Sequence, residues 1–456
     1  MFEKQLKSPL RSPLMRAILA GGGTAVASLP QIGSLVARWS SDAITPQADN
    51  TSLSSWADSI GGVVASQVTG AAQPKYRTAR LGVKPSVQFP GSQWLSIATP
   101  GALKTAIDSH VYTMMIVFNN AGASSVGNLV GAQTAGGNNP IWFCDGSRTG
   151  RYDGTITRLA AAHTGAAFTV AGTTAWTAGK YGDSNPVERS YINGTCVGVQ
   201  ISATPVASFD FGFGAGPTGV LPVIADIYEI MVWNTALTAA EVLQVQKAMC
   251  DKYAQAYPWS GISKFRVFDG DSLSAGYGGE SFCNVSQYYG NKMASSLGLS
   301  FGQYTTTAIP SYTLNQMASK ATTDIDPIQS VTGKSVRLMA FEWYNSRAAS
   351  PATGAQTYVQ ARKSAGISQV MWGTSTDDFS HDAERTTYNN AVVAGAIGWG
   401  ADALVQIHLD SSIGVIGACP GTGPFTPYFD TDGLHMLDAG YAALNNVWQT
   451  ADALMP

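Results

Sequence analysis

Two short segments, far apart in the chain, contain the residue types that nucleophilic catalysis requires. The first is Phe-Asp-Gly-Asp-Ser-Leu at 268–273, where Ser272 follows a short, mainly apolar run that is typical of a buried strand. The second is Asp-Gly-Leu-His at 432–435, where Asp432 and His435 lie three residues apart, just before a helical pattern. A serine hydroxyl needs a base to take its proton, and the base needs an acid that holds its tautomer. The two segments therefore predict a triad of Ser272, His435 and Asp432.

Each segment alone also has an ordinary structural interpretation. Gly-Asp-Ser is common in turns, so the first segment fits a strand-to-helix turn with a capping serine. His435 fits a surface histidine near a helix start, with Asp432 as the N-cap. The combination favours catalysis, because one segment lies near the beginning and the other near the end of a region in which strands and helices alternate. Triads assemble in space, so the distance between the segments in the sequence is no objection.

Through these motifs, residues 262–456 resemble the SGNH or GDSL hydrolases. In that family the serine of Gly-Asp-Ser-Leu is the nucleophile, and an Asp-x-x-His near the C-terminus supplies the acid and the base. The resemblance implies that Ser272, Asp432 and His435 are the catalytic residues. It also implies an α/β, flavodoxin-like domain of three layers that hydrolyses an ester through an acyl-enzyme.

The family also forms an oxyanion hole, with a glycine after its second strand and an asparagine after its third. The hole implied here comprises the N–H groups of Ser272 and Ser311 and the side-chain amide of Asn345. Asn345 lies in Phe-Glu-Trp-Tyr-Asn-Ser and matches the family asparagine. Ser311 lies in Ala-Ile-Pro-Ser-Tyr-Thr-Leu, at the place where the family has glycine. Ordinary loop residues are the alternative at both positions.

Two further residues depart from the family pattern. Trp343 and Ser346 replace the usual glycine and aspartate of Gly-x-Asn-Asp, and we expect Trp343 to fill space near the site. A side chain at Ser311, after Pro310, narrows the loop and the acyl pocket. These changes leave open a second hypothesis, in which the region is a degenerate module that binds a receptor without catalysis.

The N-terminal region, 30–256, is predicted to be all-β. Short apolar or alternating runs are separated by glycine, asparagine and serine turns, a spacing that favours a sandwich or jelly roll. A single helix is predicted at 238–253, where Thr238 and Glu241 form a capping box, and 257–261 is predicted to be a linker. The predicted strands are 35–39, 86–89, 112–118, 167–170, 189–192 and 227–233.

This region resembles concanavalin-like, laminin-G-like lectin domains. The likeness is carried by Leu-Val-Ala-Arg-Trp at 35–39, Trp-Ala-Asp-Ser-Ile-Gly-Gly at 56–62, Gln-Pro-Lys-Tyr at 73–76, Val-Gln-Phe-Pro-Gly at 87–91 and Ile-Tyr-Glu-Ile-Met-Val-Trp at 227–233. It implies a jelly-roll sandwich, of a kind that often binds glycans or pads a larger assembly, and it assigns no sugar or calcium ligand. Trp94, Trp142 and Trp176 are predicted to pack within the sandwich, because tryptophan usually buries most of its area.

From about 262 onward, strand-like and helical runs alternate, which predicts a parallel sheet with helices on both faces. The predicted strands are 265–268, 303–309, 336–342, 367–372 and 403–408, and the predicted helices lie near 284–297, 354–365, 382–398 and 438–452. In such folds the site forms at the carboxyl ends of the strands. Ser272, Ser311, Asn345 and a long loop at 409–431 all fall there, and loops of this length are often functional.

Several other polar residues have simple structural interpretations. His408 and His381 could be imagined as an alternative base or as metal ligands. A histidine at a strand end, and acids at 377–378 that begin a helix, explain these residues more simply. Glu342 is expected to accept hydrogen bonds from backbone at its strand end, and Asp271 is expected to be structural.

Composition narrows the class of protein. The 456 residues are too many for one ordinary domain, so two or three are expected. The net charge is −3 and no basic run extends beyond the first sixteen residues, so nucleic-acid binding is not predicted. Only 12% of the residues are charged, against an average of about 25%, which suits β-rich extracellular or virion-surface proteins. The five cysteines are predicted to be buried apolar residues, and neither a metal nor a cofactor is expected.

Residues 1–29 are predicted to be a flexible or assembly arm. Basic residues precede a small, apolar run at 17–27, which also fits a secretion signal, but Gly-Gly-Gly at 21–23 weakens its apolar core. No stretch approaches the roughly 20 apolar residues that a membrane span needs. The low charge and the opening Arg-Trp-Ser-x-Asp at 38–42 resemble bacteriophage tail fibre or tailspike proteins, which implies a place in the virion and, as a family expectation, a homotrimer.

The sequence therefore predicts a serine esterase that removes O-acetyl groups from a bacterial surface polysaccharide, either capsule or lipopolysaccharide. The expected partners are that acetylated polysaccharide and, through the arm, other phage tail proteins. One alternative is a non-catalytic glycan- or receptor-binding tail protein. Another is a secreted bacterial carbohydrate acetylesterase.

Overall fold

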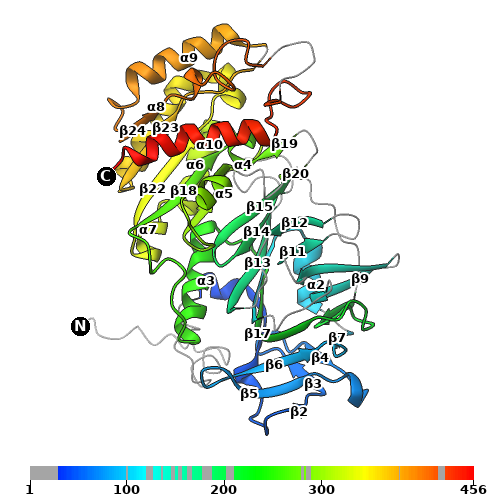
Figure 1. The fold of residues 1–456 in the computed structure, drawn as a ribbon. Coiled ribbons are helices and arrows are strands. Elements are labelled where there is room, and N and C mark those ends of the chain that lie inside the picture. Colours follow the sequence, from blue (N-terminus) through cyan, green and yellow to red (C-terminus); the bar gives the residue numbers. More distant parts are fainter. Residues whose placement is uncertain are drawn as a thin grey trace, which may run out of the picture.

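The structure is a computed structural model that describes residues 29–98, 101–119, 127–134, 137–144, 149–152, 157–161, 167–176, 187–201, 210–278, 282–283, 289–378, 380–419 and 427–456. The arm predicted at 1–29 lies outside these residues, apart from Leu29. Figure 1 shows a β-rich N-terminal part beside a C-terminal part in which helices cover a sheet. None of the described helices combines the length and apolarity that a bilayer crossing requires.

Within the described residues, two antiparallel sheets make up the N-terminal part. One has nine strands in the order β15-β14-β13-β8-β17-β6-β5-β2, with β1 paired to β17, and the other has eight in the order β12-β11-β10-β9-β16-β7-β4-β3. The bounds are β1 Leu35–Ser40, β2 Thr51–Ser52, β3 Ser55–Ala57, β4 Val64–Ser66, β5 Lys75–Leu81, β6 Lys84–Pro90, β7 Leu95–Ile97, β8 Tyr112–Asn119, β9 Gly127–Thr134, β10 Gly137–Cys144, β11 Thr149–Tyr152, β12 Thr157–Ala161, β13 Thr169–Trp176, β14 Val187–Ile192, β15 Thr195–Ile201, β16 Asp210–Phe213 and β17 Ile224–Trp233.

Buried side chains from both sheets fill the space between them. Trp39 of β1 packs edge-on against Phe213 of β16, with ring centroids 5.0 Å apart, and Trp56 of β3 contacts the same ring. The six strands predicted from the sequence all contain strand residues here, although β13 begins at Thr169 and not at 167. Two packed sheets of alternating strands agree with the predicted sandwich, while the finer jelly-roll assignment stays a prediction.

The three tryptophans predicted to pack within the sandwich behave differently from one another. Trp142 is fully buried among the side chains between the sheets, as predicted. Trp176 is also buried, but it belongs to the cluster that the two parts share. The guanidinium of Arg189, on the neighbouring strand β14, lies 5.1 Å from its ring centroid. Trp94 is partly exposed. The prediction is therefore correct for one of these positions, because burial of a tryptophan does not say against which layer it packs.

Among the described residues of this part, two α-helices accompany the sheets, whereas one was expected. The predicted helix is α3 Ala239–Lys252, and its capping box is confirmed, because Thr238 accepts from the Glu241 N–H while the Glu241 carboxylate accepts from the Thr238 N–H. The second helix, α2 Gly101–Asp108, buries Leu103, Ala106 and Ile107. Their i, i+3, i+4 spacing is the helical signal that the all-β interpretation overlooked.

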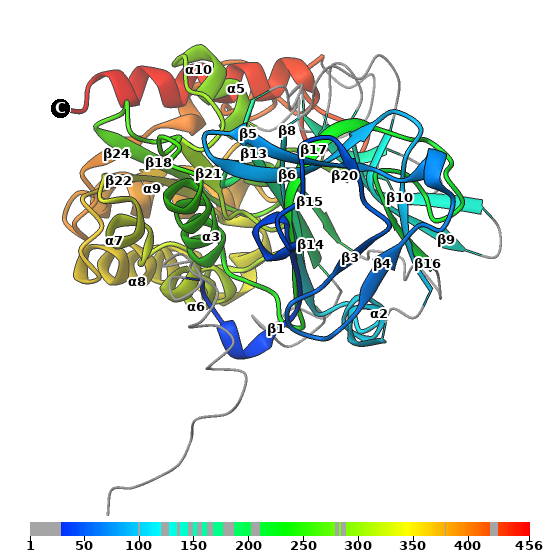
Figure 2. The same cartoon turned by 90° about the horizontal axis from the view of Figure 1, so that it is seen from below.

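The C-terminal part contains a five-stranded parallel sheet in the order β21-β18-β22-β23-β24. Figure 2 shows α5 and α10 on one side of this sheet and α6, α7 and α8 on the other. The strands are β18 Lys264–Gly270, β21 Tyr304–Thr306, β22 Ser335–Phe341, β23 Gln369–Gly373 and β24 Ala403–Val405, and a separate two-stranded sheet pairs β19 Tyr277–Gly278 with β20 Phe282–Cys283. The helices are α4 Ser272–Ala275, α5 Tyr289–Ser296, α6 Leu314–Asp324, α7 Ile328–Thr332, α8 Pro351–Ser364, α9 Asp382–Gly395 and α10 Asp438–Ala453.

Alternation along the strands explains the two helical layers. In β22, Val336 and Leu338 face the layer that includes α6 and α8, while Met339 and Phe341 face α5 and α10. Every predicted strand and helix of this part is present, although 284–288 lies outside the described residues. The sequence interpretation missed α6 and α7. The three-layer arrangement is seen directly, and its flavodoxin-like classification stays a prediction.

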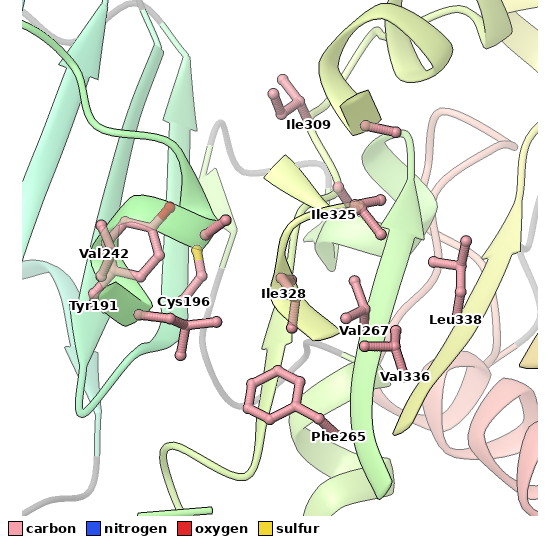
Figure 3. Close-up of a cluster of buried hydrophobic side chains, with 14 of the residues drawn as sticks. Tyr191, Cys196, Val242, Phe265, Val267, Ile309, Ile325, Ile328, Val336 and Leu338 are labelled. Carbon is pink, nitrogen blue, oxygen red and sulfur yellow. The ribbon is translucent and has the colours of Figure 1, made fainter. Parts of the chain in front are cut away.

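The two parts share one hydrophobic core. In Figure 3, side chains of the N-terminal part face those of the C-terminal part across a short gap between ribbons that the side chains fill. The cluster includes Tyr191, Cys196 and Val242 on one side and Phe265, Val267, Ile309, Ile325, Ile328, Val336 and Leu338 on the other. Trp259, in the predicted linker, is only 1% exposed and belongs to the same cluster. Trp259 therefore anchors the segment at 257–261 in the core, although Ser260 and Gly261 are exposed.

A buried ion pair reinforces this interface. Arg189 of β14 donates to Asp324 at the end of α6 over 2.8 Å, and both side chains are at most 1% exposed. The other Asp324 oxygen accepts from the Ala239 N–H, at the first residue of α3, over 2.9 Å. Burial opposes the charge of Asp324, but Arg189 and Lys320 outweigh it and lower the pKa of this carboxyl.

We expect Asp324→Ala to destabilise the whole chain. The change removes the carboxylate that faces the buried Arg189 guanidinium, and breaking such a buried pair costs about 3–5 kcal/mol. Urea unfolding would measure the free energy. Asp49→Ala is the control, because Asp49 pairs with Arg77 at the surface, where water screens the charges, and little change is expected. Equal effects of the two variants would contradict a role for Asp324 in joining the parts.

Candidate active site

The turn after β18 presents the predicted nucleophile. Strand β18 ends at Gly270, Asp271 is the N-cap of α4, and Ser272 is the first residue of that helix. Gly270 has a φ of +150°, and a Cβ there would lie 2.1 Å from the Ser274 Oγ and 2.7 Å from the Phe341 carbonyl oxygen. Only glycine fits this close approach, so the chain can turn sharply enough to place Ser272 beyond the strand end.

The structure brings the three predicted catalytic residues together. His435 Nε2 lies 2.9 Å from Ser272 Oγ, and His435 Nδ1 lies 2.5 Å from an oxygen of Asp432. Ser272 is 8% exposed, so its hydroxyl lies near the surface without being fully solvated. This is the geometry in which a histidine accepts the serine proton while a carboxylate holds the imidazole tautomer.

Asp432 is held by the backbone of its own turn. Its second oxygen accepts from the N–H groups of Leu434 and His435, over 3.0 and 2.9 Å. Partial burial opposes ionisation, but the hydrogen bond from His435 and these backbone bonds outweigh it and lower the pKa of Asp432 to about 2. Asp432 is therefore ionised throughout the range in which His435 can act as a base. It is not the N-cap of α10, which begins at Asp438.

Ser311 adopts the backbone conformation that glycine favours. Its φ is +66°, and it is exposed in the loop that follows β21. This left-handed conformation costs a side-chain-bearing residue about 1–2 kcal/mol, which gives a physical reason for a glycine at the aligned position. The loop lies against the nucleophile turn, because the Ile309 N–H donates to the Gly270 carbonyl over 3.2 Å.

Asn345 lies between Asp271 and Tyr312, which are the chain neighbours of the predicted oxyanion donors Ser272 and Ser311. Its amide Nδ2 donates to Asp271 over 3.0 Å and to the Tyr312 carbonyl over 3.3 Å. Asp271 precedes Ser272, and Tyr312 follows Ser311. The Asn345 amide thus bridges the two turns that carry Ser272 and Ser311, and it donates to an acceptor in each of them.

Two buried carboxyl groups flank Asn345, and the sequence interpretation gave neither of them a role in the site. Asp271 accepts from the Asn345 side chain, whereas Glu342 accepts from the Asn345 N–H over 2.7 Å. Burial raises the pKa of Asp271 to about 6, although the Leu273 N–H and the nearby His435 favour its charged form. Burial, and then the charge of Asp271, raise the pKa of Glu342 to about 8. The expectation that Glu342 binds backbone at its strand end is confirmed.

The departures from the family pattern have clear packing roles. Trp343 is 1% exposed and stacks on Tyr388 of α9, with centroids 6.2 Å apart, so it fills space beneath the turn. The Ser346 hydroxyl donates to Glu342 over 2.6 Å and accepts from the Leu314 N–H over 2.8 Å. A serine at this position therefore links α6 to the end of β22.

The other polar candidates take structural roles. His408 Nδ1 lies 2.9 Å from Thr374 Oγ1, and His381 Nδ1 lies 2.9 Å from Asp378. The interpretation of 377–378 as acids that begin a helix is wrong, because α9 begins at Asp382. Asp377 instead accepts from the Cys419 N–H over 2.8 Å, which ties two loops together.

The described part of the long loop at 409–431 reaches the triad. Cys419 Sγ contacts the carbonyl of Gly433, beside Asp432, over 3.1 Å, while 420–426 lies outside the described residues. Four of the five cysteines, 144, 196, 250 and 419, have buried side chains as predicted, and nothing is described of the side chain at 283. Within the described ranges, no group of three or more His, Cys, Asp and Glu side chains could hold a metal ion.

Comparison with known proteins gives partial likenesses only. No protein-family model and no curated protein matches the chain. The lipase/acylhydrolase from Enterococcus faecalis is similar over 41% of this chain and 93% of its own, at 15% identity and a TM-score of 0.32. A family 3 carbohydrate esterase from Clostridium thermocellum is similar over 42% and 96%, at 15% identity and a TM-score of 0.30. Trypanosoma rangeli sialidase is similar over 52% of this chain and only 39% of its own, at 14% identity and a TM-score of 0.35. Scores this low carry no weight for fold or activity, so the chemistry is inferred from the contacts of Ser272, His435 and Asp432.

We expect Asp432→Asn to leave the chain folded and to lower kcat for an activated acetyl ester by up to about 10⁴-fold. An amide at this position would favour the imidazole tautomer with its proton on Nε2, which cannot accept the Ser272 proton. Asp438→Asn is the control, because Asp438 is exposed and pairs with Lys292 and not with a triad residue. A small loss in Asp432→Asn, no larger than in the control, would contradict the assignment.

We also expect Glu342→Gln to stabilise the chain more at high pH than at low pH. A carboxyl whose pKa is raised on folding contributes most below its unfolded pKa, about 4.3, and that contribution is lost as the pH rises through about 8. Glutamine has no such loss. The test is the difference in unfolding free energy between variant and wild type at pH 5, 7 and 9, and a pH-independent difference would contradict the raised pKa.

Proposed function

We propose that the chain is a serine ester hydrolase that removes O-acetyl groups from a bacterial surface polysaccharide. The observation that carries the proposal is the continuous contact from Ser272 Oγ through His435 to Asp432, at 2.9 and 2.5 Å. A serine, a histidine and an ionised aspartate in this geometry are suited to acyl transfer.

The reaction proceeds in two halves. Ser272 Oγ attacks the ester carbonyl while its proton passes to His435 Nε2, and the oxyanion is stabilised by the predicted donors of Ser272, Ser311 and Asn345. The alcohol leaves with the proton from His435, and the acetyl group stays on Ser272. Water then attacks this acyl-enzyme, His435 takes the water proton and returns it to Ser272, and acetate is released.

The choice of substrate rests on the N-terminal part. A two-sheet part resembling glycan-binding modules, fused to the part that contains the triad, supports a carbohydrate ester in preference to a lipid. The resemblance of the opening segment to tail fibre and tailspike proteins supports capsule or lipopolysaccharide as the source, and a place in the phage tail. Trimer formation and contact with other tail proteins belong to the same proposal.

Two observations favour the alternative of a binding protein without catalysis. The Asn345 side-chain amide already donates to two acceptors within the protein, Asp271 and the Tyr312 carbonyl. The left-handed backbone conformation of Ser311 costs free energy that a glycine would avoid. A secreted bacterial carbohydrate acetylesterase would use the same chemistry as the phage enzyme. Activity separates the first alternative from the proposal, and genomic context separates the second.

The decisive experiment is hydrolysis of p-nitrophenyl acetate by the wild type and by Ser272→Ala. Loss of the nucleophile is expected to lower kcat by about 10⁴-fold or more. Ser274→Ala is the matched control, because Ser274 lies in the same short helix and its Oγ has no hydrogen-bond partner among the described residues. It is expected to keep most of the activity.

Release of acetate from O-acetylated capsule and lipopolysaccharide then tests the substrate class. If the protein hydrolyses the simple ester but releases no acetate from any polysaccharide, the esterase activity stands and the proposed substrate class is wrong. A folded wild-type protein that hydrolyses neither would overturn the esterase, and a glycan-binding measurement would test the binding alternative.

A further inference from the structure

Asp271 connects the nucleophile turn to the predicted oxyanion hole. One of its carboxylate oxygens accepts from the Leu273 N–H over 3.0 Å and so caps α4, directly after Ser272. The other accepts from the Asn345 side-chain amide over 3.0 Å. The side chain is 2% exposed, so water does not compete for either bond.

Only an ionised carboxylate satisfies both donors. It offers two accepting oxygens to two N–H groups, whereas a protonated carboxyl or a side-chain amide offers one acceptor and one donor. If the Asp271 oxygen that accepts from Asn345 were replaced by an O–H or N–H group, two hydrogen-bond donors would face each other. The nitrogen of Asn345 would then turn away, or its carbonyl oxygen would turn toward Asp271.

Asp271 also contributes charge to the catalytic base. His435 and Asp271 attract each other electrostatically, and the imidazole becomes cationic when it takes the Ser272 proton. The Asp432 side chain is 40% exposed, so water screens its field more than that of the buried Asp271. One of the two acids that favour the charged base is therefore partly exposed, and the other is buried.

Three titratable groups face Asp271 from the elements around it. They are Glu342 at the end of β22, Tyr388 of α9 and His435 of the loop before α10. Burial raises the pKa of Tyr388, which therefore stays neutral, and its hydroxyl donates to the Glu342 carbonyl over 2.9 Å. Burial raises the pKa of both carboxyls, and the charge of Asp271 raises that of Glu342 further, so the pair resists being ionised twice.

We propose that Asp271 is a positioning residue of the active centre, whose ionised carboxylate fixes the Asn345 amide for the oxyanion and adds a buried negative charge toward His435. The inference rests on the proposed ester hydrolysis. The Asn345 side-chain amide donates two hydrogen bonds, and the one to the Tyr312 carbonyl, at 3.3 Å, is the longer. A substrate oxygen replaces this hydrogen bond. The bond to Asp271 is kept, and it orients the amide during the reaction.

The expected signature is a steep acid limb in the pH profile. Catalysis needs ionised Asp271, whose titration near pH 6 adds about one unit to the slope that the catalytic base alone gives to the acid limb of log kcat/KM. Asp271→Asn removes one of the two titrations. We expect the slope to fall to about one and kcat to fall about tenfold or more, which is less than the roughly 10²–10³-fold loss on removing an oxyanion donor itself. KM is expected to change little.

Two further variants separate positioning from structure. Asp271→Ser keeps a good N-cap for α4 but cannot reach Asn345, so the same loss of kcat is expected as in Asp271→Asn. Glu342→Gln is the change at the matched buried carboxyl. The glutamine oxygen can keep the two backbone N–H bonds, while its nitrogen can donate to the Ser346 hydroxyl, which then accepts where it donated before. This variant is expected to keep the steep acid limb. Wild-type kcat in Asp271→Ser, or a shallow limb in Glu342→Gln, would overturn the proposal.

An NMR titration makes the test independent of activity. Selective ¹⁵N-asparagine labelling, with Asn345→Asp to identify the signal, reports the Nδ2 resonance between pH 4.5 and 8.5. We expect that resonance to titrate in the wild type and not in Asp271→Asn. If the Asn345 Nδ2 resonance shifts with pH but the protein hydrolyses no ester, the proposed function is wrong and the contact between Asp271 and Asn345 stands. If the protein hydrolyses esters but the Asn345 Nδ2 resonance does not shift with pH, the proposed function stands and the positioning role of Asp271 is wrong.

Discussion

The parallel pairing of β18 with β22 is the constraint on which the site depends. Its register sets Gly270 opposite Phe341, so the two central strands end at the same level of the sheet. The turn after β18 then presents Ser272, and the turn after β22 presents Asn345, at the same edge. A slip of one residue would turn every side chain of a strand to the opposite face and would separate the two turns. The close approach of Gly270 to the Phe341 carbonyl locks that register.

The triad could be predicted from the sequence because each of its members is placed by local structure. Asp432 and His435 share one turn, held by bonds within four residues, and Ser272 follows a strand end directly. The role of Asp271 could not be predicted in this way. It depends on burial and on a contact with Asn345, 74 residues further along, and neither is visible in a motif.

The elements that the sequence interpretation missed lie mainly where the two parts meet. The helices α6 and α7 pack against α3, and they were overlooked because the region was interpreted as two separate domains with a linker. Leu314, Met317 and Ala321 do follow a helical spacing, and Thr313 with Gln316 forms a capping box. The helical spacing was present in the sequence. What it did not identify is the surface against which the helices pack, which is α3 of the N-terminal part.

The continuous core between the parts limits how this chain can be recombined. Domains are exchanged most readily where a flexible, exposed linker joins them. Here, a cut near 262 would uncover Ile309, Ile325 and Ile328 on one fragment and Val242 on the other. Apolar faces of that kind invite self-association. A transplant that preserves solubility would have to carry β14, β15 and α3 along with the triad-containing part, so the smallest transferable segment is larger than that part alone.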